Sequence, residues 1–396
     1  TDGTLRATTA VPVRLLPSLT GLRFVLALTV LACHALWDPA WFTDPGVVRS
    51  VSWLKEGAEA AVSGFFVLSG YVLTWTHRAD GPARAFWRQR FWRIAPNHLL
   101  GWAGAVAFVA LTSARSPVDG TQGRCTVSLA TASVLLLQNW TPAWAAGACF
   151  NVPSWSISCE VFFYALFPAL IIGARAIPRR WLPAAWAATA AATLAAPLTA
   201  ALISPVEPDF ASGLPKLWLL YFFPPVRLAE FALGMLTALL LRGERRLQVP
   251  PSRLATPLAL AIASTAVLTA LAPPAFRLGA QAAVPFALFI AYAALTDLDN
   301  RPTLLSGPLM TSLGEASYAL YIVHWPLLLA YRHALGADRT FSASTGVLLA
   351  AGFAVLALAA SLLVHHFWET PLRRRGALPT VRTGVTGACT LDSRPR

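Results

Sequence analysis

The chain has 396 residues, of which 56% are hydrophobic and only 12% are charged, and its mean hydropathy is +0.57. A soluble domain carries about twice that share of charged residues, so the composition excludes an ordinary soluble protein. It indicates an all-α, polytopic membrane protein. The net charge of +13 comes mainly from arginine. Arginines that border apolar segments are explained by membrane orientation and anionic headgroups, so we expect a lipid bilayer partner and no nucleic acid. The five cysteines lack metal-ligand spacing, and no metal site is predicted.

The first apolar segment, 19–37, is interrupted by two ionisable residues, Arg23 and His34. They are eleven residues apart, which places both on one helix face, about 16 Å apart along the axis. Ionisable groups inside a membrane helix are costly and usually face a cavity or a partner. Each residue alone could have a structural role, with Arg23 reaching the headgroups and His34 bonded to a neighbouring helix. Their presence on one face favours a functional role.

The apolar segments predict ten membrane crossings, which put every arginine cluster and both termini on the cytoplasmic side. We expect three regions: a cytoplasmic N-terminal segment (1–18), one membrane domain (19–375) and a disordered C-terminal tail (376–396). Pro224-Pro225 predicts a kinked or broken helix in one segment. The expected spans are 19–37, 58–76, 96–112, 154–173, 181–203, 217–241, 255–272, 282–297, 313–333 and 345–367.

A shorter apolar segment, 127–138, is predicted to be a re-entrant or surface-lying helix rather than a span. Cys125 and Cys149 bracket it, on the outward side of the predicted topology. An oxidising exterior would permit a disulfide between them that pins the segment. Two free thiols are the alternative interpretation.

The segment 82–95 is basic and rich in Trp and Phe, and is typical of a helix at the cytoplasmic interface. Arg90 and Arg93 are three residues apart and therefore neighbours on one helix face. Two adjacent guanidiniums suit a phosphate or pyrophosphate, because each can donate two parallel hydrogen bonds. Lipid anchoring is the simpler alternative. The nearby pair of Arg23 and His34 favours nucleotide-phosphate binding.

A carboxylate, Glu160, lies inside the apolar segment 154–168 at a depth similar to that of His34. We expect Glu160 to orient His34, since a histidine–carboxylate pair fixes the ring tautomer; a protonated, merely hydrogen-bonded Glu160 is the alternative. Ser69, Tyr321 and His324 are expected to line the substrate site. Helix packing around Ser69 and hydrogen bonding at the Pro326 kink are the structural alternatives for these three residues.

Five motifs occur in an order that resembles the acyltransferase-3 family of membrane O-acyltransferases. They are R-x10-H (Arg23 and His34), GFFVLSGY (64–71), RxxR (Arg90 and Arg93), SWSISCEVFFYALFP (154–168) and SYALYIVHWP (317–326). The resemblance covers about residues 14–375. It implies transfer of an acyl group from acyl-CoA to a hydroxyl, with essential roles for Arg23, His34, Arg90 and Arg93.

The chain departs from the family pattern at two places. It has Thr20-Gly21 where the family often has Asp-Gly, and Cys159-Glu160 where the family has two adjacent glutamates. LPSLTGLRF and SWSISCE look more like the branch that acylates macrolides and other secondary metabolites. The resemblance therefore implies a macrolide or glycosidic hydroxyl as acceptor and a multi-pass protein of a bacterial-type plasma membrane.

The expected mechanism uses acyl-CoA, with acetyl-CoA as the expected form, as co-substrate and no permanently bound cofactor. Its phosphates would bind Arg90 and Arg93, assisted by Arg23. His34 would be the general base, with Glu160 orienting it, so activity is expected to fall below about pH 6. Acetylation of a cell-surface polysaccharide or glycolipid, and export of a small metabolite, are the alternative functions. The oligomeric state stays open.

Overall fold

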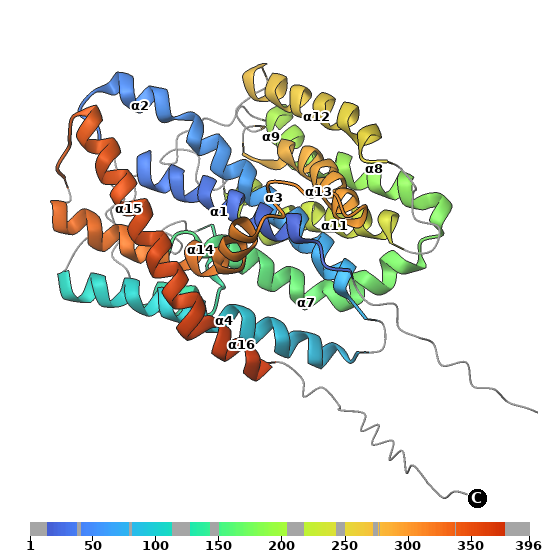
Figure 1. Cartoon of the computed structure of the whole chain (residues 1–396), viewed down its shortest axis with the longest axis horizontal. Helices are drawn as coiled ribbons and strands as arrows, with labels where there is room; N and C mark the ends of the chain where they lie inside the picture. The colour runs from blue at the N-terminus through green and yellow to red at the C-terminus, as the bar shows by residue number, and fades with distance from the viewer. Residues whose placement is uncertain are drawn as a thin grey trace, which may run out of the picture.

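The structure, a computed structural model, describes residues 14–37, 41–78, 81–112, 127–142, 150–203, 218–242, 250–271, 276, 278–336 and 338–376. These residues form helices and no strand, apart from one isolated bridge between Phe42 and Phe341 (Figure 1). Cys125, Cys149 and most of the two terminal segments lie outside the described residues. The α-helices are α1 (Pro17–Leu36), α2 (Pro45–Val51), α3 (Trp53–Thr76), α4 (Ala83–Thr112), α5 (Val127–Val134), α7 (Ser154–Ala176), α8 (Leu182–Thr193), α9 (Ala195–Ile203), α11 (Pro224–Leu241), α12 (Ser252–Leu271), α13 (Ala283–Leu298), α14 (Pro308–Leu335), α15 (Ala343–Val364) and α16 (Thr370–Gly376).

Eight helical stretches among the described residues are long and apolar enough to cross a membrane, which supports the predicted membrane protein. All ten expected spans coincide with helices, but two of them are not among the eight. The described apolar stretch of α12, Ser252–Val267, is shorter than the eight. The other, α14, carries ionisable residues at Glu315, His324 and Arg332. The count of ten is therefore not confirmed.

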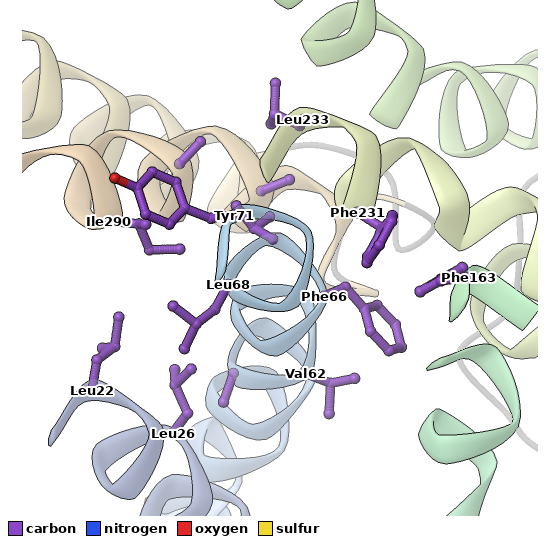
Figure 2. Close-up of a cluster of buried hydrophobic side chains, with 14 of the residues drawn as sticks. Leu22, Leu26, Val62, Phe66, Leu68, Tyr71, Phe163, Phe231, Leu233 and Ile290 are labelled. Atoms are coloured by element: carbon purple, nitrogen blue, oxygen red, sulfur yellow. The ribbon is translucent and has the colours of Figure 1, made fainter. Parts of the chain in front are cut away.

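Helix α3 lies at the centre of the largest core, between α1, α7, α11 and α13, and Figure 2 looks along it. Its Phe66 and Tyr71 are almost fully buried. Lipid gives little hydrophobic drive between membrane helices, so close packing must hold them together. Gly70 of α3 lies directly on the Phe231 carbonyl of α11, and Gly234 of α11 lies on the Val67 carbonyl of α3. The two backbones can approach this closely because neither position carries a side chain.

The helix α11 contains an ion pair that the sequence analysis did not predict, and this pair is hydrogen-bonded to α3. Arg227 and Glu230 are 1% and 2% exposed, and their nearest charged atoms are 3.1 Å apart. Ser63 of α3 accepts a hydrogen bond from the Arg227 guanidinium and donates one to Glu230. Both charges are compensated inside the bundle, so loss of either residue would leave an uncompensated buried charge.

Helix ends that the predicted topology puts on one side of the membrane meet in the structure. Arg242, after α11, donates to the Thr74 and His77 carbonyls at the end of α3. Ser18, at the start of α1, donates to Asp297 at the end of α13. The arrangement agrees with a shared side for these ends. Which side is cytoplasmic stays a prediction.

The arginine-rich segment 82–95 does not form a helix of its own. It is the first half of α4, which continues through Pro96 to Thr112; its position at the cytoplasmic interface stays a prediction. A proline usually kinks or ends a helix, but membrane helices tolerate it where neighbours cover the backbone. Here Tyr318 donates to the Ile94 carbonyl and Trp368 donates to the Pro96 carbonyl, each at 3.1 Å.

Two smaller expectations concern segments that the predicted topology puts near the outer side of the membrane. Within the short segment 127–138, residues Val127–Val134 form the helix α5, whose placement relative to the bilayer stays a prediction. The break at Pro224-Pro225 is confirmed: a π-helical turn ends at Phe222, Phe223 is extended, and α11 begins at Pro224. Asn139 donates to the Phe222 carbonyl at 3.0 Å, so the broken backbone is covered by protein.

The glycine contact between α3 and α11 predicts a strong size limit at Gly234. A methyl group there would collide with the Val67 carbonyl, so Gly234→Ala should destabilise the protein by about 1–3 kcal/mol. Gly173→Ala, in α7, is the matched control because no atom lies near its added methyl group; alanine there should be neutral or favourable to the helix. Thermal unfolding in detergent measures both variants. Equal stability of the two would contradict the packing account.

Candidate active site

Two histidines from distant parts of the chain meet between α1 and α14. The Nδ1 atom of His34 lies 2.8 Å from Nε2 of His324. The two rings are stacked, with centroids 5.1 Å apart and planes 14° from parallel. His324 is 1% exposed. His324, which was expected to line the substrate site, is thus in direct contact with His34; its role toward a substrate stays a prediction.

The hydrogen bonds assign the protons of this pair. Nδ1 of His324 lies 2.9 Å from the Leu320 carbonyl oxygen. A carbonyl can only accept, so this nitrogen carries the proton, and Nε2 of a neutral His324 is then an acceptor. His34 must accordingly donate from Nδ1, which leaves Nε2 of His34 as its unprotonated nitrogen. This assignment follows from the network of partners, and it gives the tautomer that a general base at Nε2 requires.

The surroundings of the pair are aromatic. The Trp325 ring meets His34 edge-on with centroids 5.1 Å apart. Tyr321 lies one turn before His324; its ring contacts Phe65, and its hydroxyl lies 2.8 Å from Oγ of Ser156 in α7. The Tyr321 ring lies beside that of His324, with centroids 6.2 Å apart, and its predicted contact with a substrate stays a prediction. Aromatic walls keep the local dielectric low, which strengthens hydrogen bonds inside them.

A second cluster lies toward the other end of α1. Arg23 interacts electrostatically with Arg90 and Arg93 of α4. Among the described residues, none of these three guanidiniums donates a hydrogen bond to a protein group or forms an ion pair with one. Nε of Arg90 is buried without a partner. Three neighbouring cations with available N–H groups are suited to bind an anion of several oxygens.

The carboxylate beside this cluster is Glu160. It accepts a hydrogen bond from the Tyr164 hydroxyl at 2.9 Å, and Oγ of Ser69 lies 3.1 Å from the same hydroxyl. Both Arg23 and Arg90 interact electrostatically with Glu160. The structure therefore places Ser69 and Glu160 with the guanidiniums.

This placement corrects the expected role of Glu160 as the group that orients His34. The observed partner of His34 Nδ1 is His324. Glu160 bonds instead to Tyr164, four residues later on the same helix face, beside the arginines. The spacing from 160 to 164 was visible in the sequence and could have indicated this bond. The contact between His34 and His324 spans 290 positions and leaves no signal in one sequence.

Helix α14 connects the two clusters. Tyr318, Tyr321 and His324 occupy successive turns, over about 9 Å of helix. Their side chains bond in turn to α4, α7 and α1. Tyr318 and Tyr321 both interact electrostatically with Glu160. The arrangement offers a proton acceptor at one end and an anion site at the other.

Comparisons with known proteins identify the family of the chain. Residues 16–366 match the acyltransferase-3 family, described as an acyltransferase domain. The chain is 36% identical over 377 residues to acyltransferase MdmB of Streptomyces mycarofaciens. This alignment covers 91% of this chain and 92% of that protein. No solved structure matches. The resemblance found in the motifs is thereby confirmed, and the chain belongs to the acyltransferase-3 family of membrane acyltransferases.

Proposed function

We propose that this protein is an acyl-CoA-dependent O-acyltransferase of a bacterial-type plasma membrane. Its acceptor is the hydroxyl of a secondary metabolite, either a macrolide or a glycosylated natural product. Membership of the family supports acyl transfer. The observation that carries the reaction is the hydrogen-bonded pair of His34 and His324, which leaves Nε2 of His34 able to accept a proton.

The donor is proposed to bind by its phosphates at Arg23, Arg90 and Arg93. Coenzyme A is polyanionic at its nucleotide end and carries its thioester at the end of a long pantetheine arm. Such a molecule suits a cationic site that is separated from a base by about 16 Å along α1. The arm would follow α1, past the tyrosines of α14, and deliver the thioester to His34.

In the chemical step, the acceptor hydroxyl attacks the thioester carbonyl as Nε2 of His34 takes its proton. The tetrahedral intermediate then collapses, the carbon–sulfur bond breaks, and the coenzyme A thiolate recovers that proton from the imidazolium. The products are an ester and free coenzyme A. General-base assistance contributes about 10²- to 10⁴-fold. His324 is a positioning residue here, because it holds the His34 tautomer through Nδ1.

Removal of the base should abolish ester formation. His34→Ala is expected to lower kcat by about 10²- to 10⁴-fold, measured with radiolabelled acetyl-CoA and a panel of hydroxylated acceptors. His333→Ala, an exposed histidine near the end of α14, is the matched control and should retain activity. Full turnover by His34→Ala would end the proposal. Movement of metabolite without any ester product would favour an exporter.

The positioning role of His324 predicts a particular pattern of kinetics. His324→Ala should lower kcat by about 10- to 100-fold, the usual effect of losing a partner that orients a reactive group, with little change in KM for acyl-CoA. His324→Gln should recover part of the rate, because its amide oxygen can accept from Nδ1 of His34. A rise in KM for the acceptor alone would instead assign His324 to substrate binding.

The acceptor class is tested in the producing cell. Deletion of the gene should leave a secondary metabolite lacking one ester, which the purified enzyme then acylates in vitro. Mass spectrometry of the extracted metabolites and of the surface polysaccharides separates the two acceptor classes. An unchanged metabolite profile with deacetylated polysaccharide would overturn the proposed acceptor.

A further inference from the structure

The segment that follows α15 contains a buried carboxylate fastened to α4. Glu369 is 1% exposed and lies at the end of a π-helical turn, His365–Glu369. It accepts hydrogen bonds from Asn97 of α4 at 3.1 Å and from Arg373 at 3.3 Å, and Nδ1 of His365 lies 3.2 Å away. Figure 1 shows α16 beside α4.

This attachment brings Arg373 beside the RxxR pair. Arg373 interacts electrostatically with Arg93 and with Arg90. Arg23 interacts with the same two arginines from the α1 side. The guanidiniums therefore form a row that begins at α1, passes α4 and ends at α16. Arg373, whose side chain is 39% exposed, forms the more open end.

The charges along this row are incompletely compensated by the described residues. Arg373 is paired with Glu369, and Glu315 lies near enough to interact with it. Only Nη1 of Arg373 donates a hydrogen bond to a described protein group. The other N–H groups of this guanidinium have no acceptor among the described residues. Like charges gathered in a partly buried site repel one another. A polyanionic ligand that spans the row would relieve this repulsion.

We propose that Arg373 binds the 3′-phosphate of the coenzyme A donor, held in place by Glu369. This inference rests on the proposed acyl-CoA donor and adds a subsite to it. The order of the donor's groups supplies the argument: the thioester, the pantetheine, the pyrophosphate and then the ribose 3′-phosphate. When the thioester is directed toward His34, the pyrophosphate lies at Arg90 and Arg93. The 3′-phosphate, at the far end of the donor, then lies at Arg373, the outermost guanidinium of the row.

The test compares acetyl-CoA with acetyl-3′-dephospho-CoA as donors for the full-length enzyme in detergent. The wild type should prefer the 3′-phosphorylated donor by about 10- to 100-fold in kcat/KM, the size of a lost charge-assisted hydrogen bond. Arg373→Ala should remove this preference by raising KM for acetyl-CoA. It should leave kcat/KM for the dephosphorylated donor unchanged, which reports that the variant is folded.

Arg374→Ala is the matched control. Arg374 lies on the same short helix, has the same charge and is exposed, so the donor preference should persist. Arg373→Lys should keep part of the preference, since an ammonium binds phosphate as a point charge.

Four results would overturn the inference. An enzyme that uses acetyl-CoA but does not distinguish the two donors would refute the subsite and leave the proposed function intact. Arg373→Ala that retains the preference, or that loses activity with both donors alike, would assign Arg373 a structural role. Failure of the wild type to use acetyl-CoA at all would remove the proposed donor together with the subsite.

Discussion

Ionisable side chains inside a lipid-facing helix bundle must be neutralised, paired or presented to a ligand, because lipid offers them no water. The structure uses each of these solutions in a different place. Arg227 and Glu230 form a compensated pair beside Ser63. His34 and His324 share a hydrogen bond that two neutral rings can make. The guanidiniums of Arg23, Arg90 and Arg93 have no hydrogen-bond acceptor among the described residues, which is why we propose that they bind the ligand. Function can therefore be located by asking which buried charges the protein leaves uncompensated.

The helical framework was largely predictable because apolar composition and segment length dominate membrane insertion. The break at Pro224-Pro225 followed from local chemistry alone. The continuity of α4 through Pro96 did not, since it depends on Tyr318 and Trp368, which cover nearby carbonyls from helices far along the chain. Local rules describe what a proline removes from its own helix. They do not describe what a neighbouring helix supplies.

In the candidate site too, local features were predictable and contacts between distant residues were not. The sequence identified Arg23, His34, Arg90 and Arg93 as unusual because each is a polar residue in or beside an apolar segment. It misassigned the partner of His34, since two residues at similar depth, Glu160 and His324, could equally have supplied it. Depth along a helix axis follows from residue number, whereas the facing partner depends on how helices rotate and assemble. That information is long-range and is absent from a single chain read in isolation.

The central position of α14 has a consequence for how the two ends of the site communicate. One helix bonds to α4 near the arginines through Tyr318 and to His34 through His324. A displacement of this helix at the arginine cluster would therefore also change the geometry at the His34 imidazole. In the proposed reaction, donor binding that moves α14 would therefore also change the proton affinity of His34, and by thermodynamic linkage the two effects are equal in free energy.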